Sequence, residues 1–200
     1  MSIFGPPPIQ PVPPFRKVMV FIDGGYVRKG FIKLVGHDRI DFQNLVERLR
    51  YRVDLAPAMG EITRVYYYDA IVDATEDPQK HNEQNEYCHN VGLIPNFEVK
   101  KGRLVKTGSG EYRQKGVDIL ISIDMLSKAF QNFYDVAFFI GGDDDFVDLM
   151  DTLKNLTNKK VLAAVFQHNV SPRLLESFDF SYLITKEDCE SLQLRESKTL

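Results

Sequence analysis

Aspartates placed beside glycines are the residues of this chain best suited to do chemistry. Residues 141–145 read Gly-Gly-Asp-Asp-Asp, and residues 23–25 read Asp-Gly-Gly. Glycine lets the backbone turn tightly, so the carboxylates emerge at a turn. Crowded carboxylates repel one another, and Asp oxygens without His or Cys nearby suit the hard ions Mg²⁺ and Mn²⁺. The motifs therefore predict a divalent-metal site, whose candidate ligands are Asp23, Asp118, Asp143 and Asp145.

Both motifs end an apolar run that is typical of a strand buried on both faces of a parallel sheet. Residues 17–22 and 136–140 form such runs, rich in β-branched and aromatic side chains. Parallel strands present ligand sites at their carboxyl ends, at the point where the winding of the sheet reverses. If these two strands are neighbours there, Asp23 and Asp143 face each other over one crevice. The chemistry of such a site is metal-assisted phosphodiester hydrolysis, with one or two ions.

The remaining elements alternate between strands and helices. Further strands are predicted at residues 62–72, 160–166 and 182–185, and helices at 41–53, 78–92, 116–131, 145–156 and 172–178. A short hairpin is predicted at 96–107, turning at Lys101-Gly102, and a loop over the sheet edge at 26–39. This alternation predicts an α/β fold, a three-layer α/β/α sandwich with a mostly parallel central sheet.

Apolar spacing predicts which side of each helix packs inward. In the helix at 41–53, the inward side chains are Phe42, Leu45, Val46 and Leu49, and Asp41 is the cap. In the helix at 116–131, they are Ile119, Ile123, Leu126 and Phe130. In the helix at 145–156, they are Phe146, Leu149, Met150, Leu153 and Leu156.

Each acid also has a structural interpretation. Asp144 or Asp145 could cap the helix that begins near Phe146, and Asp118 could simply favour a helix N-terminus. Capping does not explain three adjacent Asp residues, nor Asp23 after an independent strand, so the group favours a metal site. The other acids are expected to play other parts: Asp144 is solvated, Asp124 forms a surface ion pair with Lys128, and Asp69 is a weaker candidate at a strand end.

Composition bounds the class of protein. The chain has 200 residues, 44% of them hydrophobic, a formal net charge of −3 and two cysteines without paired spacing. One domain with tails fits this length, and the cysteines fit a reducing, cytoplasmic compartment with no disulfide framework or zinc site. No signal peptide or membrane span is predicted. The expected organisation is a proline-rich arm at 1–15, one domain at 16–186 and a tail at 187–200.

Basic residues concentrate in one stretch. Residues 98–115 hold six basic side chains against two acids, although the whole chain is acidic. This stretch is either an RNA guide leading toward the metal, with Tyr26 or Tyr112 stacking a base, or an exposed hairpin with ordinary solubilising lysines. A homodimer and a protein partner for the proline-rich arm are further expectations, although a solvated arm is the simpler interpretation of its weak Pro-x-x-Pro pattern.

The motifs together resemble NYN domains, the LabA-like branch of the PIN-like nucleases. The resemblance rests on residues 21–26 (Phe-Ile-Asp-Gly-Gly-Tyr), 115–118 (Lys-Gly-Val-Asp), 141–146 (Gly-Gly-Asp-Asp-Asp-Phe) and 171–174 (Ser-Pro-Arg-Leu), followed by Phe178-Asp179. Their order and spacing match across residues 17 to 185. Two positions depart from the family pattern: Tyr26 stands where many members have Asn, and Asp144 replaces a small residue.

The resemblance implies a PIN-like, Rossmann-like sandwich with divalent-metal-dependent ribonuclease activity. It implies that the four candidate acids hold Mg²⁺ or Mn²⁺, that Ser171 lies near the phosphate and that Lys115 faces the RNA backbone. With the basic stretch, the expected RNA-binding residues are Tyr26, Lys106, Arg113, Lys115 and Ser171.

Two other functions remain open from sequence. A haloacid-dehalogenase-like phosphatase would use a strand-end Asp and a later Gly-Asp motif, which residues 142–148 imitate. That family needs a second acid two residues after the nucleophile, and Gly25 occupies this position. A non-catalytic module that binds RNA or a protein with the same acids is the other alternative.

Overall fold

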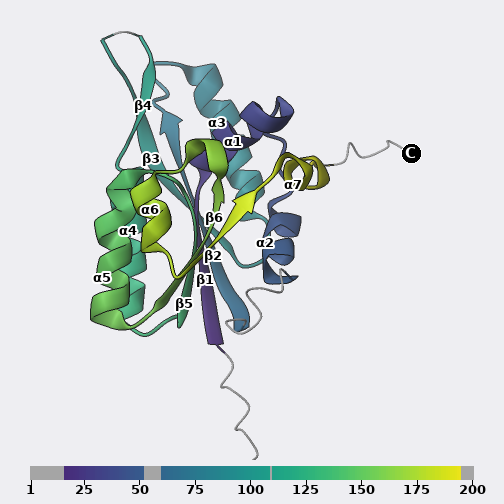
Figure 1. Cartoon of the computed structure of the whole chain (residues 1–200). Helices are drawn as coiled ribbons and strands as arrows, with labels where there is room; N and C mark the ends of the chain where they lie inside the picture. The colour runs from purple at the N-terminus through teal and green to yellow at the C-terminus, as the bar shows by residue number, and fades with distance from the viewer. Residues whose placement is uncertain (1–15, 52–59, 109, 195–200) are drawn as a thin grey trace, which may run out of the picture.

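A mostly parallel sheet forms the centre of the molecule. The computed structural model describes residues 16–51, 60–108 and 110–194, and these contain seven strands in the order β4-β3-β2-β1-β5-β6-β7 (Figure 1). The strands are β1 (Arg16–Asp23), β2 (Gly60–Val72), β3 (Phe97–Lys106), β4 (Tyr112–Lys115), β5 (Val136–Ile140), β6 (Lys160–Phe166) and β7 (Phe180–Ile184). Of the neighbouring pairs, β3 and β4 are antiparallel and the rest are parallel.

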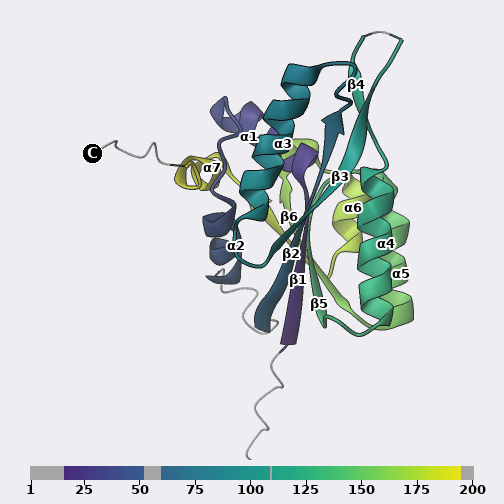
Figure 2. The ribbon, with the colours of Figure 1, turned by 180° about the vertical axis from the view of Figure 1, so that it is seen from behind.

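Helices cover both faces of the sheet, as Figures 1 and 2 show from opposite sides. One face carries α1 (Gly24–Val35), α2 (Phe42–Tyr51), α3 (Pro78–Gly92) and α7 (Lys186–Ser191). The other carries α4 (Val117–Phe130), α5 (Val147–Thr157) and α6 (Pro172–Ser177). Each layer has its own apolar core against the sheet, because side chains of a strand point alternately to its two faces. The predicted three-layer α/β/α sandwich is confirmed.

The central strands position the predicted site. β1 pairs in parallel with β5, with Ile22 opposite Ile140 at their carboxyl ends. β1 also pairs with β2, so the chain winds outward in both directions from the β1–β5 pair. Both strands are buried near their ends, which fits their unbroken apolar sequences. The ends of β1 and β5 therefore meet at the point where the winding reverses, as predicted.

The segment expected to be a loop at 26–39 is mostly helical. Asp23 accepts a hydrogen bond from the backbone N–H of Tyr26 and starts α1, and Gly36 ends it with a left-handed φ of 83°. The glycines that favoured a loop are needed for packing: a Cβ on Gly30 would lie 2.3 Å from the ring of Phe166. The loop prediction was wrong because these glycines mark close approach of helix and sheet.

The hairpin predicted at 96–107 is also wrong. Residues 97–106 form the single strand β3, parallel to β2, and the chain reverses later, between β3 and β4. Gly102 does not turn; a Cβ at this position would lie 2.7 Å from the side chain of Val117, so glycine lets α4 begin close to the strand. The basic stretch therefore spans two paired strands, which reach beyond the helical layers at one end of the molecule (Figure 1).

The inward side of α4 differs from the prediction. Its buried residues are Val117, Ile121, Asp124, Met125 and Ala129. Ile119, Ile123 and Phe130 are 64%, 59% and 63% exposed, so the apolar stripe expected in the core lies outside. In α5, Leu149, Met150 and Leu153 are buried as predicted, whereas Leu156 is 68% exposed.

The C-terminal boundary lies later than expected. Residues 186–191 form α7, capped by Thr185, and both Cys189 and Leu192 are buried. Gln193 makes a bridge with Ile40, so residues 187–194 belong to the folded domain. The predicted arm at 1–15, and Leu49 as a core residue, lie outside the residues and side chains that the structure describes. Among the described helices, none has the length and apolar character to cross a membrane.

Candidate active site

Asp23 is the most buried of the four candidate acids. It ends β1 and caps α1, with an Asp23 carboxylate oxygen 3.0 Å from the backbone nitrogen of Tyr26. Its residue is 7% exposed. Burial, with a smaller contribution from the negative charge of Asp118, raises the pKa of Asp23 to about 6 in spite of that hydrogen bond. Within the described residues no ion pair neutralises this carboxylate.

Asp143 and Asp145 form the turn that follows β5. Asp143 caps the short 3-10 turn η2 (Asp144–Phe146) and accepts a hydrogen bond of 3.3 Å from the backbone N–H of Asp145. α5 then begins after Phe146, with no side chain capping it. Neither Asp144 nor Asp145 is therefore a helix cap, which removes the structural interpretation of Asp145. Both Asp143 and Asp145 are exposed.

Asp118 reaches the same opening from α4, on the side of Asp143 and Asp145. It lies in the first turn of α4, after Gly116, whose φ of 85° turns the chain from β4 into the helix. Burial raises the pKa of Asp118, and the charges of Asp143 and Asp145 raise it further, whereas Arg113 lowers it. Asp118 thus lies within electrostatic reach of the other acids on both sides, because Asp23 also responds to its charge.

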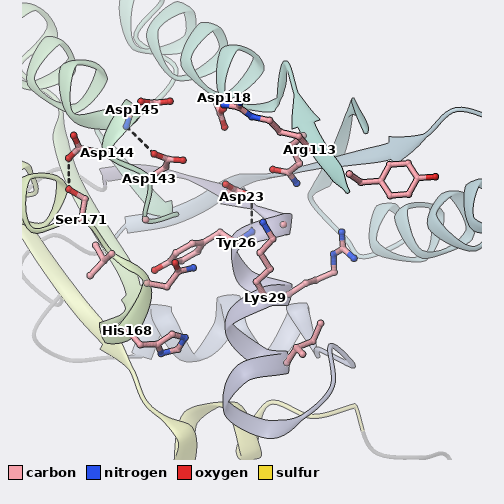
Figure 3. Close-up of a pocket in the computed structure, with 18 of the residues that line it drawn as sticks. Asp23, Tyr26, Lys29, Arg113, Asp118, Asp143, Asp144, Asp145, His168 and Ser171 are labelled. Atoms are coloured by element: carbon pink, nitrogen blue, oxygen red, sulfur yellow. Dashed lines mark hydrogen bonds between the residues drawn. The ribbon is translucent and has the colours of Figure 1, made fainter. Parts of the chain in front are cut away.

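One open cavity of about 770 Å³ contains all of these acids. In Figure 3, Asp118, Asp143 and Asp145 lie on one side of the pocket, Lys29 and His168 on the other, and Asp23 between them. Arg113 reaches the pocket from β4, beside Asp118. The pocket is thus negatively charged at its floor and carries basic side chains at its border, which suits a cation together with an anionic substrate.

The donor set fits a hard divalent ion. The four candidate carboxylates line one pocket, and those of Asp23 and Asp118 have pKa values raised by burial and by neighbouring acids, a penalty that a cation offsets. Within residues 16–51, 60–108 and 110–194, however, no three His, Cys, Asp or Glu side chains are already close enough to form a ready-made cage. The ligand set remains a prediction, and ion binding would require water ligands or side-chain movement.

Tyr26 shapes the pocket from beneath. Its ring packs 5.4 Å from that of Phe166, and its hydroxyl accepts a hydrogen bond of 2.8 Å from the Phe166 backbone N–H. A Cβ on Gly142 would lie 2.3 Å from the Tyr26 ring, so glycine is needed there. Because Tyr26 is 7% exposed, its ring has no free face for a base, contrary to the expectation that it stacks RNA. We assign it a structural part in the pocket wall.

The other expected RNA-binding residues divide into two groups. Arg113 and Ser171 line the pocket, whereas Lys106 and Lys115 are exposed on the β3–β4 hairpin outside its lining. Sequence reasoning missed Lys29, an exposed residue of α1 that lines the pocket. Its signal was available, since it follows Asp23 by six residues, but it required residues 24–35 to be recognised as a helix.

The prediction that Asp144 is a solvated side chain without partners is wrong. It accepts hydrogen bonds from the hydroxyl of Ser171 and from Arg173, the latter at 2.7 Å. The Ser171 hydroxyl also accepts a bond from the Leu174 N–H at the start of α6. Asp144 therefore ties η2 to α6 at the wall of the pocket, although the Asp144 and Arg173 side chains are 43% and 70% exposed.

Two further acids are excluded from the site by their own partners. Asp69 accepts hydrogen bonds from Arg28 at 2.8 Å and from the Tyr67 hydroxyl at 3.0 Å. Asp124 does form the predicted ion pair with Lys128, at 2.7 Å, but not on the surface: it is 7% exposed and also bonds to Lys100 and Tyr68. Each of these carboxylates is already neutralised inside the fold.

Comparison with known proteins agrees with this geometry. The sequence model of the NYN domain matches residues 17–185. A crystal structure of a protein of unknown function from Vibrio parahaemolyticus, VPA0982, superposes with a TM-score of 0.60 at 19% identity, over 85% of this chain and 93% of that one. No curated protein matches. The family match reaches from β1 to β7 and includes all four acids, and the chain belongs to the NYN domain family.

Proposed function

We propose that this protein is a divalent-metal-dependent ribonuclease that hydrolyses RNA phosphodiester bonds. The family match supports a nuclease of the PIN-like superfamily. The observation that supports a metal-dependent ribonuclease is the charge of the pocket. Asp23, Asp118 and Asp143 come from separate segments, and none of them has an ion-pair partner among the described residues. Acids left unpaired at a sheet edge fit a site completed by an external cation.

Asp23, Asp118, Asp143 and Asp145 are the residues that would hold Mg²⁺ or Mn²⁺. When bound, such an ion lowers the pKa of a coordinated water and offsets charge on the phosphate. The backbone N–H of Tyr26 fixes the Asp23 carboxylate, and the N–H of Asp145 fixes that of Asp143. Two of the four side chains are thereby oriented by the turns that carry them.

Basic side chains around the opening would bind the RNA backbone. Lys29 and Arg113 line opposite parts of the pocket border, and Lys106 and Lys115 lie farther along the β3–β4 hairpin. Phosphate contacts of this kind hold RNA without reading its sequence. Tyr112 also lines the pocket, with Lys80 over its ring at 4.0 Å, so at most one ring face is open to a base.

The cysteines fit the reducing, cytoplasmic compartment that we infer for this activity. Cys88 and Cys189 are free and buried. Burial raises the pKa of the Cys88 thiol to about 11 and that of Cys189 to about 12, which keeps both protonated and unreactive. The proposed activity therefore needs no disulfide.

The test is cleavage of labelled single-stranded RNA with Mn²⁺, with chelator alone, and with two matched variants. Asp143→Asn removes a proposed ligand, whereas Asp148→Asn makes the same change on the exposed side of α5, outside the pocket. We expect Asp143→Asn to lower the rate at least ~100-fold and Asp148→Asn to leave it unchanged. Cleavage that persists in chelator or in Asp143→Asn would contradict the mechanism.

A second candidate function, RNA binding without cleavage, is favoured by one observation. The absence of a ready-made three-ligand cage among the described residues is what a non-catalytic relative would show. Tight binding of the same RNA, without cleavage in Mn²⁺, would select this function. Release of phosphate from a small phosphomonoester, blocked in Asp23→Asn, would instead select the phosphatase chemistry.

A further inference from the structure

The outward face of α4 is apolar along its whole length. Ile119, Ile123 and Phe130 are 64%, 59% and 63% exposed, and Phe133 just beyond the helix is 48% exposed. Every exposed residue of α4 is one of these apolar side chains. Leu126, which is partly buried, completes the i, i+4, i+7, i+11 spacing of one straight stripe. We call residues 119, 123, 126, 130 and 133 the α4 stripe.

The neighbouring helix shows that this is not a property of the whole layer. α5 lies beside α4 (Figures 1 and 2) and packs against the same core. Three of its four exposed side chains, Asp148, Asp151 and Asn155, are polar, and the fourth is Leu156 near its C-terminal end. A helix that faces water normally has this pattern. The apolar face of α4 therefore needs an explanation of its own.

The charges of α4 are turned away from the stripe. Asp124 and Lys128 pair with each other at 2.7 Å, and their side chains are only 10% and 13% exposed. Asp118 points into the pocket described above. A partner that covers the stripe therefore buries no unpaired charge of α4, which is the usual cost of burying a helix face.

We propose that the α4 stripe is the interface of a homodimer, in which two copies of α4 pack antiparallel about a two-fold axis near Leu126. The order of the side chains makes the stripe complementary to itself. With Leu126 near the axis, Ile123 lies opposite Phe130 of the partner subunit, and Ile119 faces the C-terminal end of the partner's helix, beyond which Phe133 is exposed. The contacts are reciprocal, as an isologous interface requires.

The size of the stripe also fits a second copy. If a fully exposed large side chain presents roughly 200 Å², the four exposed members offer on the order of 450 Å². That lies in the middle of the range for the largest apolar patch on a monomer, ~300–600 Å². It is more than half of the ~800 Å² that each partner contributes to a standard interface. The flanking residues of α4 and α5 supply the polar rim.

The dimer leaves both proposed active sites open. None of the stripe residues lines the acidic pocket. Asp118 lies at the N-terminal end of α4, so antiparallel packing puts the two pockets at opposite ends of the helix pair. The proposal is therefore independent of the ribonuclease activity, and variants of the stripe leave the proposed metal ligands intact.

The test is the molecular mass of the full chain in solution, by sedimentation equilibrium at micromolar concentrations. We expect about 46 kDa, twice the 23.0 kDa of one chain. The double variant Ile123→Glu/Phe130→Glu should weaken association at least ~100-fold while the circular dichroism and melting temperature are retained. The matched control is Leu93→Glu, which changes an isolated side chain, 68% exposed, in the opposite layer and should leave the dimer unchanged.

A cysteine cross-link tests the direction of packing. In an antiparallel pair, Leu126→Cys lies opposite its copy and should form a disulfide-linked dimer under mild oxidation, whereas Phe130→Cys should not. Parallel packing would cross-link both. A monomeric wild-type chain, or a dimer unaffected by Ile123→Glu/Phe130→Glu, would overturn the proposed interface. Cross-linking of both cysteine variants would overturn the antiparallel geometry.

Discussion

Two groups of carboxylates in this molecule have opposite surroundings. Asp124 is buried on the inner side of α4 and receives hydrogen bonds from Lys100, Lys128 and Tyr68, at 2.7 to 2.9 Å. Asp23 is equally buried, but its hydrogen bond comes from a backbone N–H and its nearest influences include two further acids. Asp124, which lies outside the pocket, therefore has two cationic partners within the fold, Lys100 and Lys128. The pocket acids Asp23, Asp118 and Asp143 have no ion-pair partner among the described residues.

The pKa values of the two acids shift in opposite directions. Burial works against ionisation of Asp124, but the hydrogen bonds from Lys100, Lys128 and Tyr68 outweigh it and lower its pKa. For Asp23 the hydrogen bond from the Tyr26 N–H offsets burial only in part, and the pKa rises to about 6. The ionised form of Asp124 therefore stabilises the fold, and this contribution is lost as pH falls through the folded pKa. The ionised form of Asp23 destabilises the fold at pH values above the pKa of Asp23.

Removing Asp124 should produce the largest change in stability. Asp124→Ala leaves Lys100 and Lys128 without their buried partner, and we expect a loss of about 3 kcal/mol in the free energy of unfolding. Urea unfolding at neutral pH measures it. Asp151→Ala, which removes an exposed acid 3.6 Å from Lys154, is the matched control and should change stability by less than ~0.5 kcal/mol. Equal losses in both variants would show that the burial of Asp124 adds nothing to what its ion pairs contribute to stability.

Asp23→Asn should instead stabilise the protein. The pKa of Asp23 is about 6 in the fold against an ordinary value of 3.8, so the folded state binds the proton more tightly and stability falls as pH rises from about 4 to about 6. Above that range the loss is up to about 3 kcal/mol. Asn still accepts the Tyr26 N–H bond. Without metal, at pH 7.5, we expect a higher free energy of unfolding than wild type and a flatter profile with pH; a lower one would show that the charge is compensated.

A divalent ion should reverse the destabilisation in the wild type. Mn²⁺ at roughly thirty times its dissociation constant is expected to add about 2 kcal/mol of stability by mass action. Thermal unfolding with Mn²⁺ and with chelator measures the shift in melting temperature. Asp118→Asn should reduce the shift, whereas Asp148→Asn, on the outer side of α5, should retain it. A shift of the same size in both variants would place the ion elsewhere.

The sequence predicts the central strands β1 and β5, together with the acids that follow them, better than the strands β3 and β4. β1 and β5 are short apolar runs without helical spacing, and the acids directly after them had to reach the carboxyl edge once the sheet was parallel. Both strands can be recognised because burial on both faces leaves no polar position. That β1 and β5 are neighbours is only a condition of the sequence prediction, because the alternation of strands and helices does not fix their order, and the structure supplies it.

What the sequence does not predict depends on tertiary contacts. α4 has two apolar sides, one at Val117, Ile121 and Met125 and the other along the α4 stripe, and periodicity alone does not choose between them. The side that carries Asp124 packs inward because Lys100 and Tyr68, from other strands, supply its partners. In the same way, the glycines of α1 resemble a loop until Tyr67 and Phe166 are placed against Gly24 and Gly30.

Asp144 belongs to neither group of acids and should show the smallest effect. It has a cation partner, Arg173, but both side chains are largely exposed, at 43% and 70%, so water screens the pair. Arg173→Ala should therefore cost at most ~1 kcal/mol in the free energy of unfolding, with the bond from Ser171 retained. A double-mutant cycle of Asp144→Asn and Arg173→Ala measures the coupling. A coupling above ~2 kcal/mol would show that the exposed pair of Asp144 and Arg173 stabilises the fold as strongly as the buried pairs of Asp124.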